Sequence, residues 1–495
     1  MLQQQLVIGL DCSTTATKAI AFDASGRIVA QAHEPLPLAS PRPHYYEQHA
    51  DDWWRSASHA LAEVTRQVDP LRIVALGIAN QRETFVPLDA SGIVLRPAIV
   101  WLDERCKDEV EPFARAIGKK KIHRITGKPP DYAPVVYRLA WMKKHEPERF
   151  RKIGMICDVH AYIAWKLTGA FKTSWASADP LGLLNMKTKR WSSAVLDALR
   201  LREHQLPAVC MPGSVLGRLG EQASRETGLN GQVIVVAGGG DGQCAGLGSN
   251  ALSTRRAYLN LGTAVVAGVY APDYTVDTAY RTMCACAEGG YYCECSLRAG
   301  TFAIDWFVRR ILGADPARDR DIYRKLEEEA REIEAGCDGL MFLPYLCGVM
   351  NPHWDMYARG AFVGLAASHH RGHMYRSILE GIAFEQRFAL DAVERSLDVH
   401  VRELAAIGGG TSSALWCQIL ADVTGRTMLF PSSAEASALG AAIAAAVGAG
   451  WYPTFPSAAK GMTGIARTMK PDLRRRRLYQ RLFPAYERLY PSLDN

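Results

Sequence analysis

Short apolar runs alternate with polar turns over the first 31 residues. The runs at 6–11, 18–23 and 27–31 are separated by the small-residue segment "CSTTAT" and by "ASG". Apolar runs of this length, bounded by small and polar residues, are typical of β-strands. We therefore predict an antiparallel meander of three strands whose first turn is rich in hydroxyl groups.

A helical period replaces this alternation over residues 50–68. The residues that fall near one face of the predicted helix are Trp54, Ala57, His59, Leu61 and Val64. The apolar run at 73–79 then predicts a buried strand. Strands and helices alternate along the chain, which indicates the α/β class.

The pattern of the N-terminus returns near residue 256. Residues 256–270 again predict strand, small-residue turn and strand, so the second half opens as a weak repeat of the first. The elements predicted after it are helices at 302–312, 320–336 and 373–396, a loop at 343–365, a strand, triple-glycine turn and helix at 404–425, and a small-residue helix at 436–450. We place the domain boundary between two similar halves, 1–250 and 251–495, which would enclose a cleft.

The composition is that of an ordinary globular protein of 495 residues, and its net charge of +7 is spread along the chain. This charge is compatible with a phosphate-bearing substrate and does not imply nucleic acid. No apolar run is long enough to span a bilayer and the N-terminus lacks a secretory signal, so we expect a cytoplasmic protein without a membrane partner. The basic runs at 119–121 and 474–477 are interpreted as solvated helix faces.

The 12 cysteines are scattered, which favours free thiols in a reducing compartment. One group, in "CACAEGGYYCEC", needs separate treatment. If Gly289 and Gly290 form a two-residue turn, Cys286 lies opposite Cys293 and Cys284 opposite Cys295 on one face of a hairpin. Such a face could bind zinc, but zinc sites usually space their cysteines by about two to four residues, so core packing is favoured.

Three turns rich in glycine or hydroxyl groups each follow an apolar strand, at 11–18, 261–263 and 408–413. Backbone N–H groups in such turns can converge on an anion, and glycine permits close approach. The Walker A pattern and the dinucleotide GxGxxG pattern do not occur, which argues against a P-loop NTPase and a Rossmann dehydrogenase.

Asp11 and Asp241 stand at strand ends among these turns, Asp241 within the glycine run "GGGDGQCAGLG". In a phosphate-binding cleft, one carboxylate can hold Mg²⁺ through its waters and another can accept the proton of an attacking hydroxyl. The alternative is structural, because aspartate is a preferred cap: Asp11 would cap a turn, and Asp241 a helix that begins near Gln243. Residue type alone leaves both interpretations open.

A series of segments, in order from about residue 6 to residue 450, resembles the FGGY family of carbohydrate kinases. They include "GLDCSTTATKAIAFD", "VVAGGGDGQCAGLG", "LNLGT" and "IGGGTSSALWCQILADVTG". The resemblance implies two actin-like ATPase (ribonuclease-H-like) domains that flank a central cleft. It also implies transfer of the γ-phosphoryl group of ATP to a hydroxyl of a small-molecule sugar or polyol, with Mg²⁺ as cofactor.

The resemblance assigns roles to single residues as well. Asp241 would be the general base that deprotonates the substrate hydroxyl, and Asp11 would hold Mg²⁺. Arg82, Glu83 and Trp101 would bind the sugar together with Asp241. The alternative for Arg82 and Glu83 is a surface ion pair, and an isolated tryptophan is more often a core residue. The residues that would bind the nucleotide are Thr14, Thr15, Lys18, Gly262, Thr263, Gly409 and Gly410. Homodimers are frequent in the family.

Different segments of the chain resemble kinases that act on different substrates. Long stretches, including "EQHADDWW" and "RPAIVWLDERC", are most similar to xylulokinases, whereas "NQRET" at 80–84 is similar to glycerol kinases, whose arginine and glutamate bind the polyol. Tyr132 lies near the place where glycerol kinases supply a tyrosine, in a segment that does not align cleanly. D-xylulose is the first expectation, and glycerol or another short polyol is the second. A third class, a non-catalytic ATP-binding module of actin or chaperone type, is opposed by Asp241 and by the Arg82–Glu83 pair.

Overall fold

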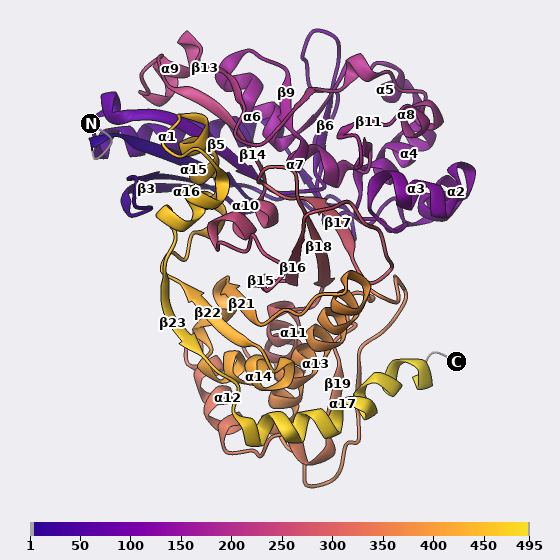
Figure 1. The fold of residues 1–495 in the computed structure, drawn as a ribbon. Coiled ribbons are helices and arrows are strands. Elements are labelled where there is room, and N and C mark those ends of the chain that lie inside the picture. Colours follow the sequence, from indigo (N-terminus) through magenta and orange to yellow (C-terminus); the bar gives the residue numbers. More distant parts are fainter. Residues whose placement is uncertain (1–3, 494–495) are drawn as a thin grey trace.

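The chain folds into two α/β halves, each built on a central sheet (Figure 1). A computed structural model describes residues 4–493. The strands of the N-terminal sheet are, in spatial order, β13 (Val215–Arg218), β14 (Ile234–Gly240), β5 (Ile73–Asn80), β1 (Leu6–Cys12), β2 (Ala16–Phe22) and β3 (Ile28–Pro35). Those of the C-terminal sheet are β17 (Arg281–Cys284), β18 (Tyr291–Leu297), β16 (Val265–Ala271), β15 (Arg256–Leu261), β21 (Glu403–Ile407), β22 (Thr427–Pro431) and β23 (Ile465–Met469).

The two sheets share one topology, which confirms the repeat predicted from the sequence. β1 pairs antiparallel with β2 and parallel with β5, and β15 pairs in the same way with β16 and β21. A further parallel strand and an antiparallel edge strand follow in each sheet, β14 and β13 in one and β22 and β23 in the other. On the opposite side, β3 completes the predicted meander and β18 is its counterpart. This order is the actin-like arrangement that the resemblance implied.

Helix α1 (Ala50–Gln67) confirms the predicted helix and three of the five residues predicted on one face, Ala57, Leu61 and Val64. Trp53, Ala57, Leu61 and Val64 are buried, whereas Trp54 is half-buried and the His59 side chain is 60% exposed. The buried set follows the helical period that packs on β2 and β3. Trp54 and His59 lie on the neighbouring, more exposed side of the helix, so the prediction was wrong for these two residues.

Smaller elements surround the N-terminal sheet and build the pocket loops described below. They are β4 (Glu47–Gln48), β6 (Phe85–Leu88), β7 (Ala98–Ile99), α2 (Lys107–Ile117), α3 (Lys119–Thr126), α4 (Val135–His145), α5 (Pro147–Arg151), β8 (Met155–Asp158), α6 (Val159–Thr168), β9 (Lys172–Ser174), α7 (Trp175–Ala178), β10 (Leu184–Asn185), β11 (Arg190–Trp191), α8 (Ser193–Leu199), β12 (Ala208–Cys210) and α9 (Glu221–Thr227). β4, β7, β6 and β8 form a separate sheet. α10 (Asp241–Gly248) follows β14 without an intervening loop.

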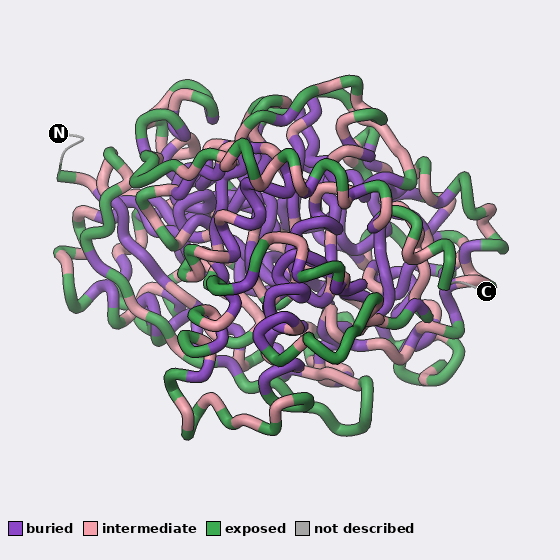
Figure 2. The backbone as a smooth tube through the Cα atoms, turned by 90° about the horizontal axis from the view of Figure 1, so that it is seen from below, coloured by how far each residue is buried: buried purple, intermediate pink, exposed green. Residues whose placement is uncertain are grey.

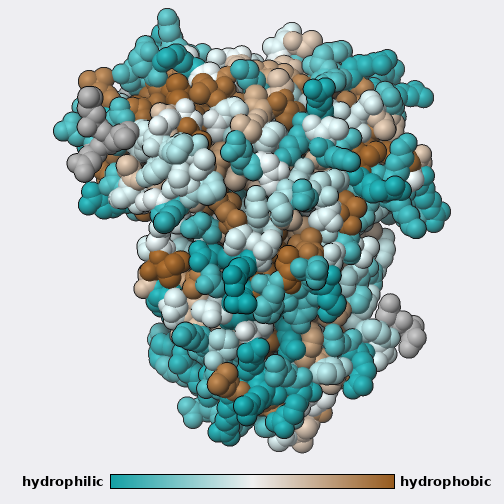
Figure 3. Space-filling view, in the orientation of Figure 1, coloured by the Kyte–Doolittle hydropathy of each residue, from teal (hydrophilic) through white to brown (hydrophobic). Residues whose placement is uncertain are grey.

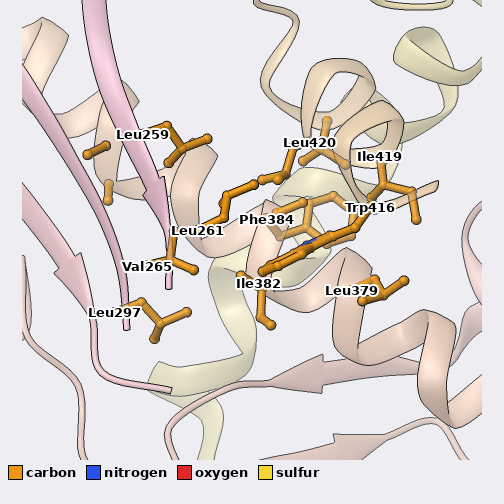
Figure 4. Close-up of a cluster of buried hydrophobic side chains, with 14 of the residues drawn as sticks. Leu259, Leu261, Val265, Leu297, Leu379, Ile382, Phe384, Trp416, Ile419 and Leu420 are labelled. Carbon is orange, nitrogen blue, oxygen red and sulfur yellow. The ribbon is translucent and has the colours of Figure 1, made fainter. Parts of the chain in front are cut away.

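Long helices cover the C-terminal sheet. α13 (Arg371–Leu397) and α14 (Ala414–Thr424) pack against each other, and Figure 4 shows Trp416 between side chains of these helices and the leucine and valine residues of the sheet. The predicted helix at 302–312 is α11 (Thr301–Trp306), which continues as a π-helical turn, and the predicted helix at 320–336 is shorter, α12 (Ile322–Arg331). Two short strands, β19 (Met341–Leu343) and β20 (Ala361–Val363), pair across the predicted loop.

The chain returns to its N-terminal half near the end. α15 (Ala436–Gly448) and α16 (Phe455–Met462) lie beside the N-terminal strands, where yellow ribbon meets indigo in Figure 1. Glycine makes the contact of α15 close: a Cβ on Gly9 would lie 1.8 Å from the Ala438 carbonyl oxygen. α15 covers the face that carries Val7, whereas Leu6 and Ile8 point to the cluster beneath α1. Both faces of the sheet are therefore buried, and the boundary at 250/251 stays a prediction.

Buried backbone fills the centre of the molecule and exposed backbone forms its rim (Figure 2). Hydrophilic residues predominate over the lower part of the face in Figure 3, with scattered apolar patches. Lys119, Lys120 and Lys121 are exposed on α3, which confirms a solvated helix face there. On α17 (Leu473–Leu493), Arg474 and Arg477 are exposed, whereas Arg475 pairs with the buried Asp422 at 2.6 Å. Within residues 4–493, no helix has the length and apolarity needed to cross a membrane.

The cysteine hairpin forms with a different register from the one predicted. Cys284 pairs with Tyr291 and Thr282 with Cys293, because the turn spans 286–289 rather than the two glycines alone. The four cysteines are fully buried and divide among three hydrophobic clusters, Cys293 and Cys295 in one, Cys284 in another and Cys286 in a third. They pack as core residues and face no common point, and all 12 cysteines are free thiols.

Candidate active site

Asp241 lies at the junction of β14 and α10, on a cavity of about 460 Å³ between the two halves. It is the first residue of α10 rather than its cap, since Gly240 occupies the cap position. Its Oδ1 accepts a hydrogen bond from the Gly242 N–H at 2.7 Å, and its side chain is 40% exposed to the cavity. Burial raises the pKa of Asp241 above its ordinary value, while the Arg82 guanidinium and the Gly242 N–H lower it.

Arg82 contacts this carboxylate from the loop after β5. Its Nε lies 3.2 Å from Oδ1 of Asp241, and its Nη1 lies 2.7 Å from Oε2 of Glu294 on β18. Glu294 is fully buried and also accepts from the Tyr258 hydroxyl at 2.6 Å. Burial alone would raise the pKa of Glu294, but the charges of Arg281 and Arg82 outweigh it and lower the pKa to about 2. Arg82 is therefore held between the base candidate and a buried carboxylate.

Glu83 pairs with Arg281, which lies opposite Glu294 on the β17–β18 hairpin. Its Oε1 accepts from Arg281 Nη1 at 2.8 Å, and Arg281 also pairs with Glu294. Glu83 has a positive φ of 47°, a conformation that costs about 1–3 kcal/mol for a non-glycine residue and persists where the surroundings fix it. The alternative of a surface ion pair is thus excluded, because Arg82 and Glu83 belong to a buried network in which each binds a residue of the C-terminal sheet.

The glycines around Asp241 make room for Arg82. A Cβ on Gly240 would lie 2.5 Å from Arg82 Cγ, and a Cβ on Gly242 would lie 3.1 Å from its Cζ. A Cβ on Gly238 would meet the Ile78 carbonyl oxygen of β5 at 2.0 Å. Side chains at these positions would displace the guanidinium or the neighbouring strand, which accounts for the glycine run.

Aromatic residues also line the cavity. Trp101 is half-buried, and its Nε1 donates to the Thr14 hydroxyl at 2.8 Å. Tyr132 is nearly buried under Arg298, whose guanidinium lies 4.5 Å from the ring centroid and 2.6 Å from Asp131. The structure brings Trp101 and Tyr132 to the same cavity as Arg82, Glu83 and Asp241, although Tyr132 comes from the segment whose alignment was unclear.

Asp11 lies at the end of β1, close to Asp241. Burial and the charge of Asp241 raise the pKa of Asp11 to about 7, against the effect of Lys18. Its Oδ1 is buried and has no hydrogen-bond partner within residues 4–493. A carboxylate oxygen that is buried, unpartnered and beside a second carboxylate fits a Mg²⁺ ligand better than a turn cap. Lys18 lies beside Asp11 in the β1–β2 register and pairs with Glu435 at 2.7 Å.

A second cavity of about 480 Å³ adjoins the first. Gly409 and Gly410 line it, together with Trp416 and Tyr375. Thr263 lines both cavities, and Gly262 and Thr14 line the first. Thr15 is exposed and is absent from the described lining of either cavity. The turns after β1, β15 and β21 therefore converge, as their position in matching topologies requires.

Sequence reasoning missed Arg281, Glu294 and Tyr258, which complete the network around Arg82. The segment that contains Arg281 and Glu294 drew attention only for its cysteines. The signal was available, because a glutamate inside an otherwise apolar strand is rarely buried without a partner of opposite charge.

Known proteins are similar to this chain over nearly its whole length. The family models described as the FGGY family of carbohydrate kinases, N-terminal domain and C-terminal domain, match residues 6–248 and 257–449. The xylulose kinase of Escherichia coli (strain K12) is 29% identical over 495 residues, which cover 99% of each chain. Solved structures of a xylulose kinase and a gluconate kinase from Lactobacillus acidophilus are each 25% identical, with a TM-score of 0.92 over 99% of this chain and 98% of theirs.

These matches confirm the resemblance read from the sequence and the actin-like fold that it implied. They also decide against an ATP-binding module that phosphorylates no sugar, since both halves match kinase domains. The chain belongs to the FGGY family of carbohydrate kinases, phosphotransferases that use an alcohol group as acceptor.

Proposed function

We propose that the protein transfers the γ-phosphoryl group of ATP to a hydroxyl of a small neutral sugar, with D-xylulose as the first substrate. The observation that carries the proposal is the position of Asp241 on a cavity that shares Thr263 with the glycine-lined second cavity. A sugar in the first cavity and ATP in the second would meet beside this carboxylate. The relative from E. coli and one of the solved structures are xylulose kinases, which favours that sugar.

Asp241 is the general base in this proposal. The Arg82 guanidinium and the Gly242 N–H favour its ionised form, so it can accept the proton of the substrate hydroxyl. Base catalysis of this kind contributes about 10²–10⁴-fold, and positioning of the reacting groups contributes a larger share. Arg82 and Glu83 line the cavity that would hold the sugar, and Trp101 supplies an aromatic surface to it.

The three converging turns bind the nucleotide. Thr14 after β1 and Gly262 and Thr263 after β15 would hold the phosphates, while Gly409 and Gly410 would border adenosine. Asp11 would hold Mg²⁺, which supplies charge neutralisation at the phosphates. Lys18 lies beside Asp11, and its ammonium group is already paired with Glu435. It would therefore contact the phosphates as part of an ion pair.

The charges of the cavity favour a neutral substrate over a sugar acid. Arg82, Arg281 and Arg298 line it, and each already has a carboxylate partner within 3 Å, in Glu294, Glu83 or Asp131. An aldonate carboxylate would meet these neutralised cations and the negative charge of Asp241. Hydroxyl groups, which donate and accept, suit such a wall better.

The proposal is tested by ADP release measured across D-xylulose, D-ribulose, glycerol, erythritol and gluconate. We expect the largest kcat/KM with D-xylulose. Glycerol or erythritol in first place would establish the alternative, which the Arg82–Glu83 pair in the cavity supports. Gluconate in first place would contradict the charge argument. ADP release that ignores every sugar would contradict sugar phosphorylation itself.

A further inference from the structure

Arg138 on α4 is a buried arginine that the reaction described above does not use. Its side chain is fully buried, and within residues 4–493 it has no carboxylate at ion-pair distance. A buried cation is costly unless other groups replace its hydration. The groups that do so here are backbone carbonyl oxygens, and they come from the loops that carry the cavity residues.

One nitrogen of the Arg138 guanidinium binds the loop after β5. Nη1 of Arg138 donates to the carbonyl oxygen of Glu83. Glu83 is the residue with a positive φ, so this bond helps to fix a conformation that the chain does not favour by itself. Arg82 precedes Glu83 directly, so a shift of this carbonyl would also move the guanidinium that contacts Asp241.

The second nitrogen contacts backbone carbonyl groups of two further loops. Nη2 of Arg138 donates to the Ala133 carbonyl oxygen at 2.5 Å, and lies 3.4 Å from the carbonyl oxygens of Tyr132 and of Trp101. Glu83, Trp101 and Tyr132 all line the cavity, and they lie on separate loops. A planar guanidinium can join them because its donors point in fixed, diverging directions.

We propose that Arg138 is a positioning residue for the sugar, which holds the loops of Glu83, Trp101 and Tyr132 in register. It touches no substrate and acts through the backbone of the residues that do. This inference rests on the proposed function, which places the sugar in this cavity. It assigns Arg138 to the sugar side of the reaction and leaves the ATP side independent of it.

The test compares Arg138→Lys and Arg138→Met with the wild type, using the sugar that the wild type phosphorylates best. Lysine keeps the charge but loses the planar fork, and methionine keeps most of the length but none of the donors. We expect the sugar KM to rise about tenfold or more in both variants, with the ATP KM within about twofold. The methionine variant should show the larger rise, because it leaves all the carbonyl groups without a donor.

Arg376 supplies the matched control. It is a buried arginine on α13 that donates to the Ala330 carbonyl oxygen and to Glu380, within the C-terminal half. Arg376→Met should lower the melting temperature and leave the ratio of the two KM values unchanged. This difference separates positioning of the sugar from general stability.

The outcomes divide clearly. Folded Arg138 variants whose sugar and ATP KM values rise together, or whose sugar KM stays within about twofold, would overturn the proposal. If only Arg138→Met fails to fold, Arg138→Lys decides; if neither folds, Arg138 is purely structural and the proposal is wrong. Wild-type enzyme that phosphorylates no sugar in the panel contradicts the proposed function instead, and that result is obtained before any variant is measured.

Discussion

Glu294 of the C-terminal sheet binds Arg82 of the N-terminal half with 2.7 Å between Oε2 and Nη1, and the two side chains are 0% and 10% exposed. The pair joins the halves beneath the cavity and orients the guanidinium that contacts Asp241 at 3.2 Å. Breaking a buried pair from one side leaves the other charge without compensation, so this contact affects both stability and the sugar site.

Replacing Arg82 by alanine should raise the sugar KM far more than the ATP KM and should destabilise the fold, because Glu294 loses one of its two cations. Loss of one partner of a buried pair typically costs about 3–5 kcal/mol. Steady-state kinetics and denaturant unfolding measure the two effects. Combined with Glu294→Gln, the double variant should lose less than the sum of the single variants by about 0.5–3 kcal/mol. Equal effects on both KM values would remove Arg82 from the sugar pocket.

Asp241→Asn should reduce sugar phosphorylation by about 10²–10⁴-fold and leave ATP binding nearly intact. Asparagine keeps an acceptor for the Gly242 N–H but cannot take a proton from the sugar. Single-turnover phosphorylation and ATP titration provide the two readouts. Turnover close to that of the wild type would refute the role of Asp241 as base.

Asp11→Asn should raise the Mg²⁺ concentration needed for half-maximal activity by about tenfold or more. The unpartnered carboxylate oxygen is replaced by a neutral amide, which binds a hard cation less well. Titration of activity with Mg²⁺ at constant ATP measures the change. An unchanged Mg²⁺ dependence would return Asp11 to a structural role.

Gly440→Ala should destabilise the protein by about 1–3 kcal/mol or more, since overpacking a close contact forces the backbone apart. A Cβ at this position of α15 would lie 1.9 Å from the Cys244 carbonyl oxygen of α10. Gly231→Ala is the control, because its Cβ would meet no atom within 4 Å. Urea unfolding of both variants should show a loss for Gly440 alone; equal stability of the two would contradict the tight packing of α15.

Glu385 on α13 makes stability depend on pH. Burial raises its pKa to about 7, although the hydroxyls of Tyr345 and Tyr486 donate to it at 2.9 and 3.0 Å. The folded state therefore holds a proton that the unfolded state releases from an ordinary pKa of 4.5, so this contribution to stability is lost as pH rises from about 4.5 to 7. Glu385→Gln keeps the acceptor oxygen and has no charge to bury.

The variant should consequently be more stable than the wild type above neutral pH, by up to about 3 kcal/mol, with little difference near pH 4. Melting temperatures measured across this range test the sign. A variant that is less stable than the wild type at every pH would show that the charged form of Glu385 is not disfavoured in the fold.

The sequence was most informative where local chemistry and function coincide. Asp11 and Asp241 were recognised because acidic residues among glycines and hydroxyls after apolar strands are unusual, and the repeat of strand and turn near residue 256 predicted the second sheet. Site residues whose role depends on partners distant in sequence were harder to recognise from the sequence. Arg138 lies in the apolar helix segment "VVYRLAW", where an arginine reads as a solvent-exposed residue until its carbonyl partners are seen.

Faces and registers were predicted less well, for physical reasons. Trp54 was assigned to the buried face of α1 in place of Trp53 because adjacent tryptophans fit either of two neighbouring faces. The cysteine hairpin was shifted because a pair of glycines is compatible with both a short and a longer turn. The observed register places Arg281 directly opposite Glu294, and Arg82, distant in sequence, joins this pair from the other half.

The return of α15 to the first sheet also sets when that sheet can be completed during translation. Val7 and Ala75 belong to an apolar cluster that contains Ala438, Ala441 and Ala445. Until the ribosome has released this late helix, that side of β1 and β5 remains uncovered, and an exposed apolar face invites association with other chains. The N-terminal half is thus expected to mature only after the chain has been made through α15, and a fragment ending at residue 250 should aggregate when expressed alone.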